Sequence, residues 1–235
     1  SVYAFTPFAT AAVLVLAVLI GIWRGSDTAG GMVVDRLYET AVGEHSTVNL
    51  PDGSQLVLNT NSLVTVSYTD ELRVLTLSRG EIHINVAHDT SRPLRVIAGD
   101  RIVQAVGTAF NVELNKDRTV ELIVTDGKVL VERRSKEEQL PMSMLSKVTQ
   151  STTAKAVSKG EKIVLGSTAE EVKKIEVADI DVSLSWRQGN LIFRGESLEE
   201  AVAEISRYTA VKFEFLDESI KRVRVAGLFK AGDVN

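Results

Sequence analysis

Apolar and polar residues alternate with a period of two in short runs from about residue 41 onward. The clearest runs are 64–66, 82–86, 110–114, 120–124 and 129–131. A period of two is typical of strands that bury one face and expose the other. Turn-forming residues separate the runs, and no helical pattern interrupts them until late in the chain. We therefore predict a mainly β protein, with an all-β domain over residues 41–168.

Glycines at the ends of these runs predict where the chain turns. Turns are expected at Pro51-Asp52-Gly53, Asn59-Thr60-Asn61, Ser78-Arg79-Gly80, Ala98-Gly99-Asp100 and Asp126-Gly127. The last of these lies between residues 120–125 and 128–132, which predicts a hairpin on a two-residue Asp-Gly turn. Because glycine-terminated strands recur, we expect the strands to stack in a solenoid-like arrangement.

A polar stretch interrupts the strand pattern at residues 132–159. Its charges alternate in sign, which is typical of a solvated loop or insertion rather than of a basic binding patch. A closing strand of the β domain is predicted at 160–166. Residues 169–185 then act as a connector to the last part of the chain.

The segment 186–235 follows a different pattern. A strand at 190–194 leads into an amphipathic helix over 197–208, whose apolar residues recur at helical spacing. Ser197 and Glu200 form a capping-box pair at the start of this helix. Alternation at 211–215 and a new apolar run from Val223 predict two more strands. The segment is therefore expected to be a small β-α-β-β module.

The sheet of this module is expected to be incomplete. A sheet of so few strands leaves backbone N–H and C=O groups unpaired at its edges, and such edges can accept a strand from another protein. The last predicted strand is apolar and carries few charges that would block pairing. We predict that the residues that bind a partner are Val223, Val225, Leu228 and Phe229. An equally supported alternative is that a further C-terminal part of the same protein fills this edge.

The N-terminal segment contrasts with the rest of the chain in having no charge before Arg24. Residues 5–23 are almost continuously apolar and, as a helix, would rise about 28 Å, close to the thickness of a bilayer core. A secretory signal peptide is the alternative, but no basic segment precedes the apolar run and no Ala-x-Ala site follows it. We predict a transmembrane helix at 5–23 and a juxtamembrane linker at 24–40.

Composition excludes several function classes. The net charge is -4 and cysteine is absent, which argues against a nucleic-acid surface and excludes thiol chemistry and disulfides. His45, His83 and His88 do not form a metal motif, and we expect His83 and His88 to face solvent on opposite faces of a strand. No pattern of a nucleophile and base or of a phosphate-binding loop is present. We therefore predict no metal, no cofactor and no enzyme activity on a substrate.

Motifs in the β domain and the last segment, taken in order, carry a family resemblance. Each motif alone is weak, but their order and spacing together are specific. They are Val48-x-Leu50-Pro51-Asp52-Gly53-Ser54, Leu56-x-Leu58-Asn59-Thr60-x-Ser62, Leu75-x-Leu77-Ser78-Arg79-Gly80-Glu81, Val106-Gly107-Thr108-Ala109-Phe110-Asn111-Val112, Asp126-Gly127-Lys128-Val129, Trp186-x-x-Gly189-x-Leu191-x-Phe193, Ser197-Leu198, Arg207-Tyr208 and Val225-x-Gly227-x-Phe229. In these residues the chain resembles the FecR family of transmembrane anti-sigma regulators.

The resemblance implies a single-pass protein of the bacterial inner membrane whose C-terminal region is periplasmic. Regulators of this family relay a signal from a TonB-dependent outer-membrane transporter of an iron complex to an extracytoplasmic-function sigma factor. Periplasmic and intramembrane proteases act in that relay, and no direct contact with nucleic acid is implied. Residues 186–235 resemble part of the secretin/TonB short N-terminal domain. The polar stretch 132–159 is not typical of the family.

Two questions stay open on the sequence alone. In some family members the bond that corresponds to Gly107-Thr108 cleaves itself by an N-to-O acyl shift, but the sequence favours the structural alternative, a bulge in which glycine allows a close approach of the backbone. The second question is the function class. The alternative to a signal relay is a structural module of an envelope secretion or transport assembly, and an enzyme acting on envelope polysaccharide has less support.

Overall fold

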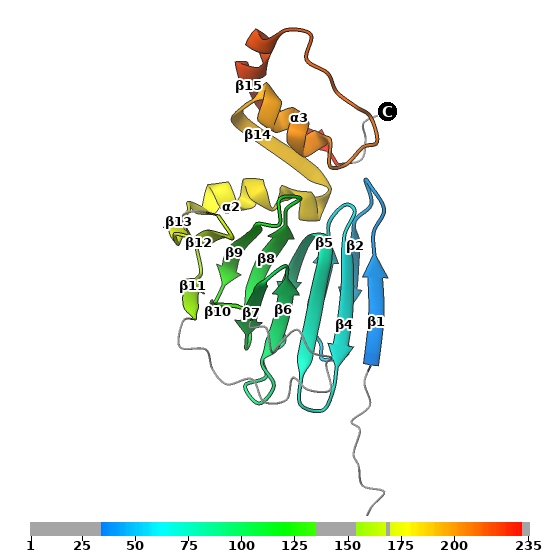
Figure 1. Cartoon of the computed structure of the whole chain (residues 1–235), viewed down its shortest axis with the longest axis vertical. Helices are drawn as coiled ribbons and strands as arrows, with labels where there is room; N and C mark the ends of the chain where they lie inside the picture. The colour runs from blue at the N-terminus through cyan, green and yellow to red at the C-terminus, as the bar shows by residue number, and fades with distance from the viewer. Residues whose placement is uncertain (1–33, 135–153, 168–169, 232–235) are drawn as a thin grey trace, which may run out of the picture. The chain divides into compact units, whose positions relative to one another are not determined.

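The computed structural model describes residues 34–134, 154–167 and 170–231. The predicted transmembrane helix at 5–23 and most of the polar stretch at 132–159 lie outside these residues. Within the described ranges, no helix is both long enough and apolar enough to cross a membrane. The fold class is confirmed: the protein is mainly β, with a curled sheet and a small C-terminal α+β part (Figure 1).

Thirteen strands form the curled sheet, and it has two halves that share the long strand β5 (Arg73–Asn85). The first half contains, in spatial order, β1 (Val34–Glu39), β4 (Leu63–Tyr68), the start of β5, β6 (Leu94–Ala98), β7 (Arg101–Ala105), β10 (Lys128–Arg133) and β11 (Lys155–Ser158). The second half contains β2 (Ser46–Asn49), β3 (Gln55–Leu58), the end of β5, β8 (Ala109–Leu114), β9 (Val120–Asp126), β12 (Glu161–Leu165) and β13 (Lys173–Lys174). Only β5 and β6 pair in parallel among these strands.

The core lies between the two halves and follows the predicted alternation. Leu56, Ile82, Phe110 and Leu122 of the second half are fully buried. They belong to the same apolar cluster as residues of the first half such as Val64. The side chains that alternate with them point to the outer face of each half.

Three of the predicted turns, at 59–61, 78–80 and 126–127, are corners where the chain passes between the halves. Residues 78–80 lie inside β5, which continues through Gly80 with φ at +86°. The Asp126-Gly127 hairpin is also wrong, because β9 pairs with β8 and β12 whereas β10 pairs with β7 and β11. A glycine with positive φ allows either a tight hairpin or a sharp corner. The local sequence therefore does not distinguish the two.

The Pro51-Asp52-Gly53 turn is confirmed, and it also contributes a buried ion pair. The guanidinium NH1 of Arg73, a fully buried residue, lies 2.7 Å from Asp52 Oδ2. Burial raises the pKa of Asp52, but hydrogen bonds from Ser54 and the bond with Arg73 outweigh it and leave this pKa lowered. The Pro51-Asp52-Gly53 motif lies at one end of the apolar core because its Asp52 is the charged partner that the buried Arg73 requires.

The connector contains a helix that the sequence pattern did not reveal. Helix α2 (Val177–Ser183) is followed by the 3-10 helix η3 (Ser185–Gln188). Ile180 and Leu184 pack against Ile123, which points outward from β9. The connector therefore covers part of the outer face of the second half.

The C-terminal module contains β14 (Asn190–Ser197), α3 (Leu198–Ile205), the 3-10 helix η4 (Glu218–Arg222) and β15 (Arg224–Lys230). The capping box is confirmed, because Ser197 Oγ accepts a hydrogen bond from the Glu200 backbone N–H and Glu200 accepts one from the Ser197 N–H. β14 and β15 form an antiparallel pair.

The strand expected at 211–215 is wrong. This segment has no strand structure, and Val211 and Phe213 are 51% and 40% exposed. Alternation produces a strand only where a neighbouring strand supplies ladder partners. None of the described strands lies beside this segment, so its pattern has no sheet to join.

Candidate functional site

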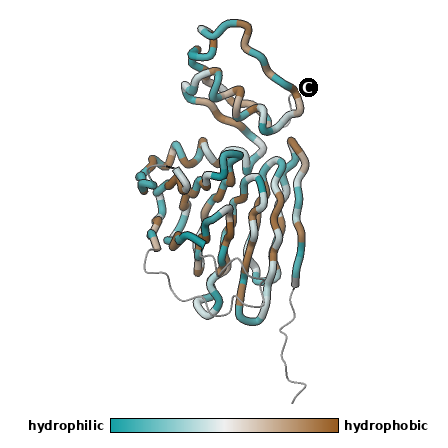
Figure 2. The backbone as a smooth tube through the Cα atoms, in the orientation of Figure 1, coloured by the Kyte–Doolittle hydropathy of each residue, from teal (hydrophilic) through white to brown (hydrophobic). Residues whose placement is uncertain are grey.

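Exposed apolar side chains gather on the C-terminal module. Figure 2 shows apolar stretches along this part of the chain. Scattered exposed apolar residues are ordinary, but a concentration of them on one small module marks an interaction surface. The large apolar residues exposed there are Val211, Phe213, Leu216, Ile220, Val223, Leu228 and Phe229.

The four predicted partner-binding residues lie on or beside β15, but they are not equivalent. Leu228 and Phe229 are 62% and 43% exposed, and the Phe229 ring also contacts that of Phe193 edge-on at 5.6 Å. Val223 is exposed, and its carbonyl accepts a hydrogen bond from the backbone N–H of Leu198. Val225 is half-buried against the apolar cluster beneath α3. Leu228 therefore offers the clearest free side chain, and Val225 belongs to the module's own packing.

A row of three glutamates crosses the outer face of the second half of the sheet. Glu81 on β5 pairs in register with Glu113 on β8, which in turn pairs with Glu121 on β9. Like charges directly opposite each other on neighbouring strands are destabilising. Lys162 of β12 compensates Glu121, with Nζ 2.6 Å from its carboxylate. Glu81 and Glu113 need a compensating positive charge from another part of the chain.

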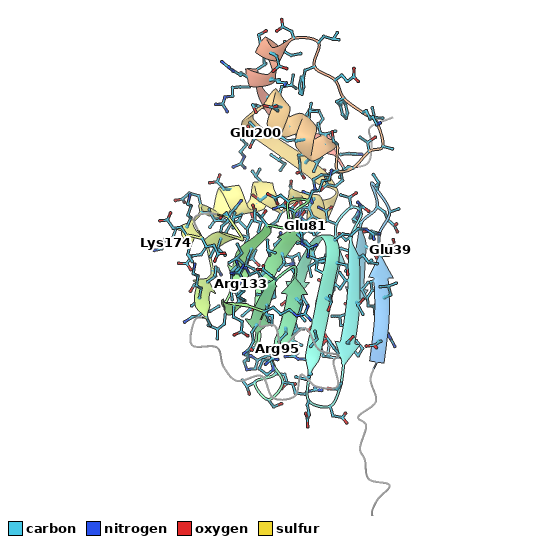
Figure 3. The ribbon with its side chains drawn as sticks, in the orientation of Figure 1. Glu39, Glu81, Arg95, Arg133, Lys174 and Glu200 are labelled. Atoms are coloured by element: carbon cyan, nitrogen blue, oxygen red, sulfur yellow. The ribbon has the colours of Figure 1, made fainter. Side chains whose placement is uncertain are left out.

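Arg207, at the end of α3 in the C-terminal module, supplies that charge. Its NH2 lies 2.7 Å from Glu81 and 3.1 Å from Glu113, and its NH1 lies 3.0 Å from Glu204. Asn111 donates a hydrogen bond of 2.9 Å to the other Glu81 oxygen. Figure 3 shows Glu81 at the end of the sheet that faces the module. One guanidinium therefore forms ion pairs with three carboxylates, two on the β domain and one on the C-terminal module.

Further polar bonds join the same two parts. Asn59 Nδ2 lies 2.8 Å from both Glu81 Oε2 and the hydroxyl of Tyr208, and all three residues are buried. Thr60 donates its hydroxyl to the backbone carbonyl of Arg207 at 3.0 Å. Val57 of β3 also packs into the module's apolar cluster. We call Asn59, Glu81, Glu113, Arg207 and Tyr208 the junction cluster.

The junction cluster perturbs the titration of its carboxylates. Burial, together with the nearby charge of Glu81, raises the pKa of Glu113 to about 8 despite Arg207. Burial also raises the pKa of Glu204. Burial alone would lower the pKa of Arg207, but Glu81, Glu204 and Glu113 raise it. Arg207 therefore stays charged, whereas the charged form of Glu113 is disfavoured by burial and by the neighbouring charge of Glu81.

His83 lies near the cluster and differs from the prediction. It is buried, whereas we expected it to face solvent, because the connector covers its face of the sheet. Its Nε2 lies 3.3 Å from the Thr125 hydroxyl and 3.2 Å from NH1 of Arg187 on η3. Burial and the charge of Arg187 lower the pKa of His83 to about 3. His88 is exposed as predicted.

Two cavities flank the junction cluster. A cavity of about 290 Å³ is lined by Glu81, Glu113 and Arg207 together with residues of the connector, β14 and α3. A second cavity, of about 820 Å³, is lined by Glu113 and Arg207 on their other side. Within the described ranges, no group of side chains has the arrangement of a metal site. The contact between the module and the β domain is therefore narrow and mainly polar.

Gly107 and Thr108 lie at the corner between β7 and β8. Thr108 is buried, and its hydroxyl has no hydrogen-bond partner. His88 packs so closely on Gly107 that an added Cβ would clash with the imidazole and lie 3.1 Å from His88 Cβ. A free hydroxyl next to a peptide carbonyl is the group that an N-to-O acyl shift requires. The structure thus brings together the predicted residues and adds a neighbouring imidazole.

Four residues of the junction cluster, Asn59, Glu81, Arg207 and Tyr208, lie in the family motifs, but Glu113 does not, and the motifs alone assign none of them a role. The sequence feature that could have indicated the junction is the kind of residue found at outward positions of the strands. Val57, His83, Asn111 and Ile123 occupy one row across β3, β5, β8 and β9, and all four are buried. Apolar Val57 and Ile123 at outward positions indicate that another part of the chain covers this face.

Comparisons with known proteins agree with this architecture. Residues 36–130 match the family model described as FecR protein, which confirms the resemblance over that region. No curated protein sequence matches the chain. Two crystal structures of candidate anti-sigma factors from Parabacteroides distasonis ATCC 8503 are similar, with TM-scores of 0.62 and 0.63 and identities of 22% and 20%. They cover 84% and 85% of this chain and 85% and 86% of their own. At these identities the likeness shows a shared fold.

Proposed function

We propose that this chain, which carries a FecR-family region at residues 36–130, is an anti-sigma regulator that relays a signal across the cell envelope. In this proposal it is a single-pass inner-membrane protein with residues after Arg24 in the periplasm. A TonB-dependent transporter of an iron complex supplies the signal through its own signalling domain, and an extracytoplasmic-function sigma factor receives it. Periplasmic and intramembrane proteases carry the signal between the two.

The observation that carries the proposal is the C-terminal module. In the described residues, β15 pairs with β14 alone, so each strand has one free edge. Leu228 and Phe229 are exposed on β15, and the charged residues of this strand, Arg224 and Lys230, lie at its ends. Such a strand accepts another strand or an apolar surface from a partner. The junction cluster then links this receiving surface to the FecR-family region.

Leu228→Glu tests the receiving surface. It places a charge on the exposed side of β15 and should weaken binding of the transporter's signalling domain at least tenfold, because the charge would have to be buried on docking. Val225→Pro is less informative, since Val225 packs inside the module. Leu37→Glu is the matched control, because Leu37 is 63% exposed against 62% for Leu228 and lies on β1 of the β domain.

Binding would be measured by titration calorimetry with purified signalling domains of candidate transporters. Equal loss of affinity in both variants, or no loss in either, would move the docking surface away from β15. A structural role in an envelope secretion or transport assembly is the competing function. A reporter for sigma-dependent transcription separates the two, because a relay changes the reporter on adding the iron complex and a structural module does not.

The proposal includes one chemical step within the chain. The Thr108 hydroxyl attacks the carbonyl carbon of Gly107, the Gly107–Thr108 amide breaks, and an ester and a free α-amine form. Water then hydrolyses the ester to give two chains. The unpaired, buried hydroxyl of Thr108 supports this step. No activity on a separate substrate and no cofactor form part of the proposal.

A further inference from the structure

The junction cluster differs from an ordinary domain contact in how its charges are arranged. Glu81 and Glu113 face each other on neighbouring strands, and each lies near Arg207 of the module. When the module is seated, one guanidinium neutralises a repulsive pair of the β domain. When it leaves, those carboxylates regain water instead of remaining buried without a partner. The β domain can therefore exist in both states.

Little apolar surface holds the module in place. Val57 is the one residue of the β domain among the buried members of the module's apolar cluster. The connector has its own apolar contact through Ile180, Leu184 and Ile123, so it does not need the module to stay on the sheet. Cavities on both sides of the Glu113–Arg207 pair leave room for water at the contact. Hydrogen bonds and ion pairs beside water can be replaced by bonds to water, so breaking them costs less free energy than separating a packed apolar interface.

The bonds that join the module to the strands and turns of the β domain converge on two consecutive residues; β14 is joined separately to the connector, through Arg194 and Asn190. Arg207 makes the ion pairs through its side chain and accepts the Thr60 hydroxyl through its backbone carbonyl. Tyr208 bonds to Asn59 through its hydroxyl. Arg207 and Tyr208 lie two and three residues after the end of α3 at Ile205, so a movement of α3 displaces both together.

We propose that Arg207 and Tyr208 form a releasable latch between the C-terminal module and the β domain. In the closed state the latch holds the module against Glu81, Glu113 and Asn59. In the open state the module, still folded, moves away and exposes this outer face of the sheet. The latch rests on the proposed function only for what opens it, namely a partner docked on β15, and it is tested on the isolated protein.

The test measures the distance between the two parts. The chain has no cysteine, so Asp70→Cys in the β domain and Leu216→Cys in the module provide two exposed sites for spin labels. Electron–electron double resonance should give one narrow distance distribution for the closed latch. Arg207→Gln should add a broad, longer component and raise the open population at least about tenfold, because two opposed glutamates lose their cation.

Two further variants sharpen the result. Tyr208→Phe removes one hydroxyl and should raise the open population about two- to tenfold. Arg222→Gln makes the same charge change on an exposed residue of η4 and should leave the distribution unchanged. Combining Arg207→Gln with Glu81→Gln removes the uncompensated buried charge and should restore part of the closed population.

Hydrogen exchange on the same variants shows whether the open module stays folded. The amides of the β14–β15 ladder should keep their protection in Arg207→Gln and in Tyr208→Phe. An unchanged distance distribution in Arg207→Gln would overturn the latch. Loss of ladder protection in both variants would also overturn it, since the bonds would then hold the module's fold and not its position. Failure of the sigma-dependent reporter alone would count against the proposed function and not against the latch.

Discussion

Gly80→Ala should be among the most damaging single substitutions in the β domain, although it adds one methyl group. Gly80 has φ at +86°, where an alanine is strained by about 1–2 kcal/mol. The added Cβ would also lie 2.6 Å from Ser62 Cα, which is backbone and has no rotamer with which to move away. Overpacking of this kind costs about 1–3 kcal/mol more.

Ser62 is also tied to the strand that carries Glu81. Its hydroxyl donates to the Glu81 carbonyl and accepts from the Glu81 N–H, each at 3.0 Å. Moving Ser62 weakens both bonds, each of which contributes about 0.5–1.5 kcal/mol. The sum predicts a loss of about 3–8 kcal/mol in the free energy of unfolding, with an accompanying displacement of the junction cluster.

Gly160→Ala is the matched control. Gly160 has φ at +77°, close to that of Gly80, but no atom lies within 4 Å of its added Cβ. Its cost should therefore be the backbone strain alone, about 1–2 kcal/mol. Urea denaturation of the purified protein, followed by circular dichroism, measures both. If the two variants lose equal stability, steric contact with Ser62 has no role at this corner and the account of β5 given above is refuted.

Three other predictions concern the buried hydroxyl of Thr108 and the titrating groups Glu113 and His83. Thr108→Val fits the same space without the hydroxyl and should give a single band on a denaturing gel, whereas wild type and Thr108→Ser should give two fragments; a single band from folded wild type would falsify self-cleavage. The folded pKa of Glu113 is raised to about 8, so the stability that this carboxyl group contributes is present below about pH 4.5 and is lost as pH rises to 8. Glu113→Gln should reduce this dependence of the urea unfolding midpoint on pH. His83 has a folded pKa of about 3, so its contribution is present above about pH 6.5 and is lost as pH falls through 3; unchanged acid stability in His83→Gln would contradict this.

Local patterns predicted the elements of the fold better than they predicted their pairing. The alternation at 82–86 and 110–114 correctly placed strands and the core, because an inward side chain is apolar whichever strand lies beside it. The Asp126-Gly127 turn was found at the right residues but joins strands of different halves, because pairing depends on distant residues. The segment 211–215 has a strand pattern but no neighbour, so its pattern was misleading for the same reason.

The junction cluster shows why function was harder to predict than fold. Several residues in or beside this cluster are polar and occupy outward strand positions, namely Glu81, Asn111 and His83. Polar residues are expected at such positions, so they do not indicate a functional role. They become informative only when the register aligns Glu81 with Glu113 and shows that two charges repel across the ladder. A repulsive pair retained on a covered face requires a cation from whatever covers it. Arg207 is that cation, and its place two residues after the end of α3 couples the position of the C-terminal module to the β domain.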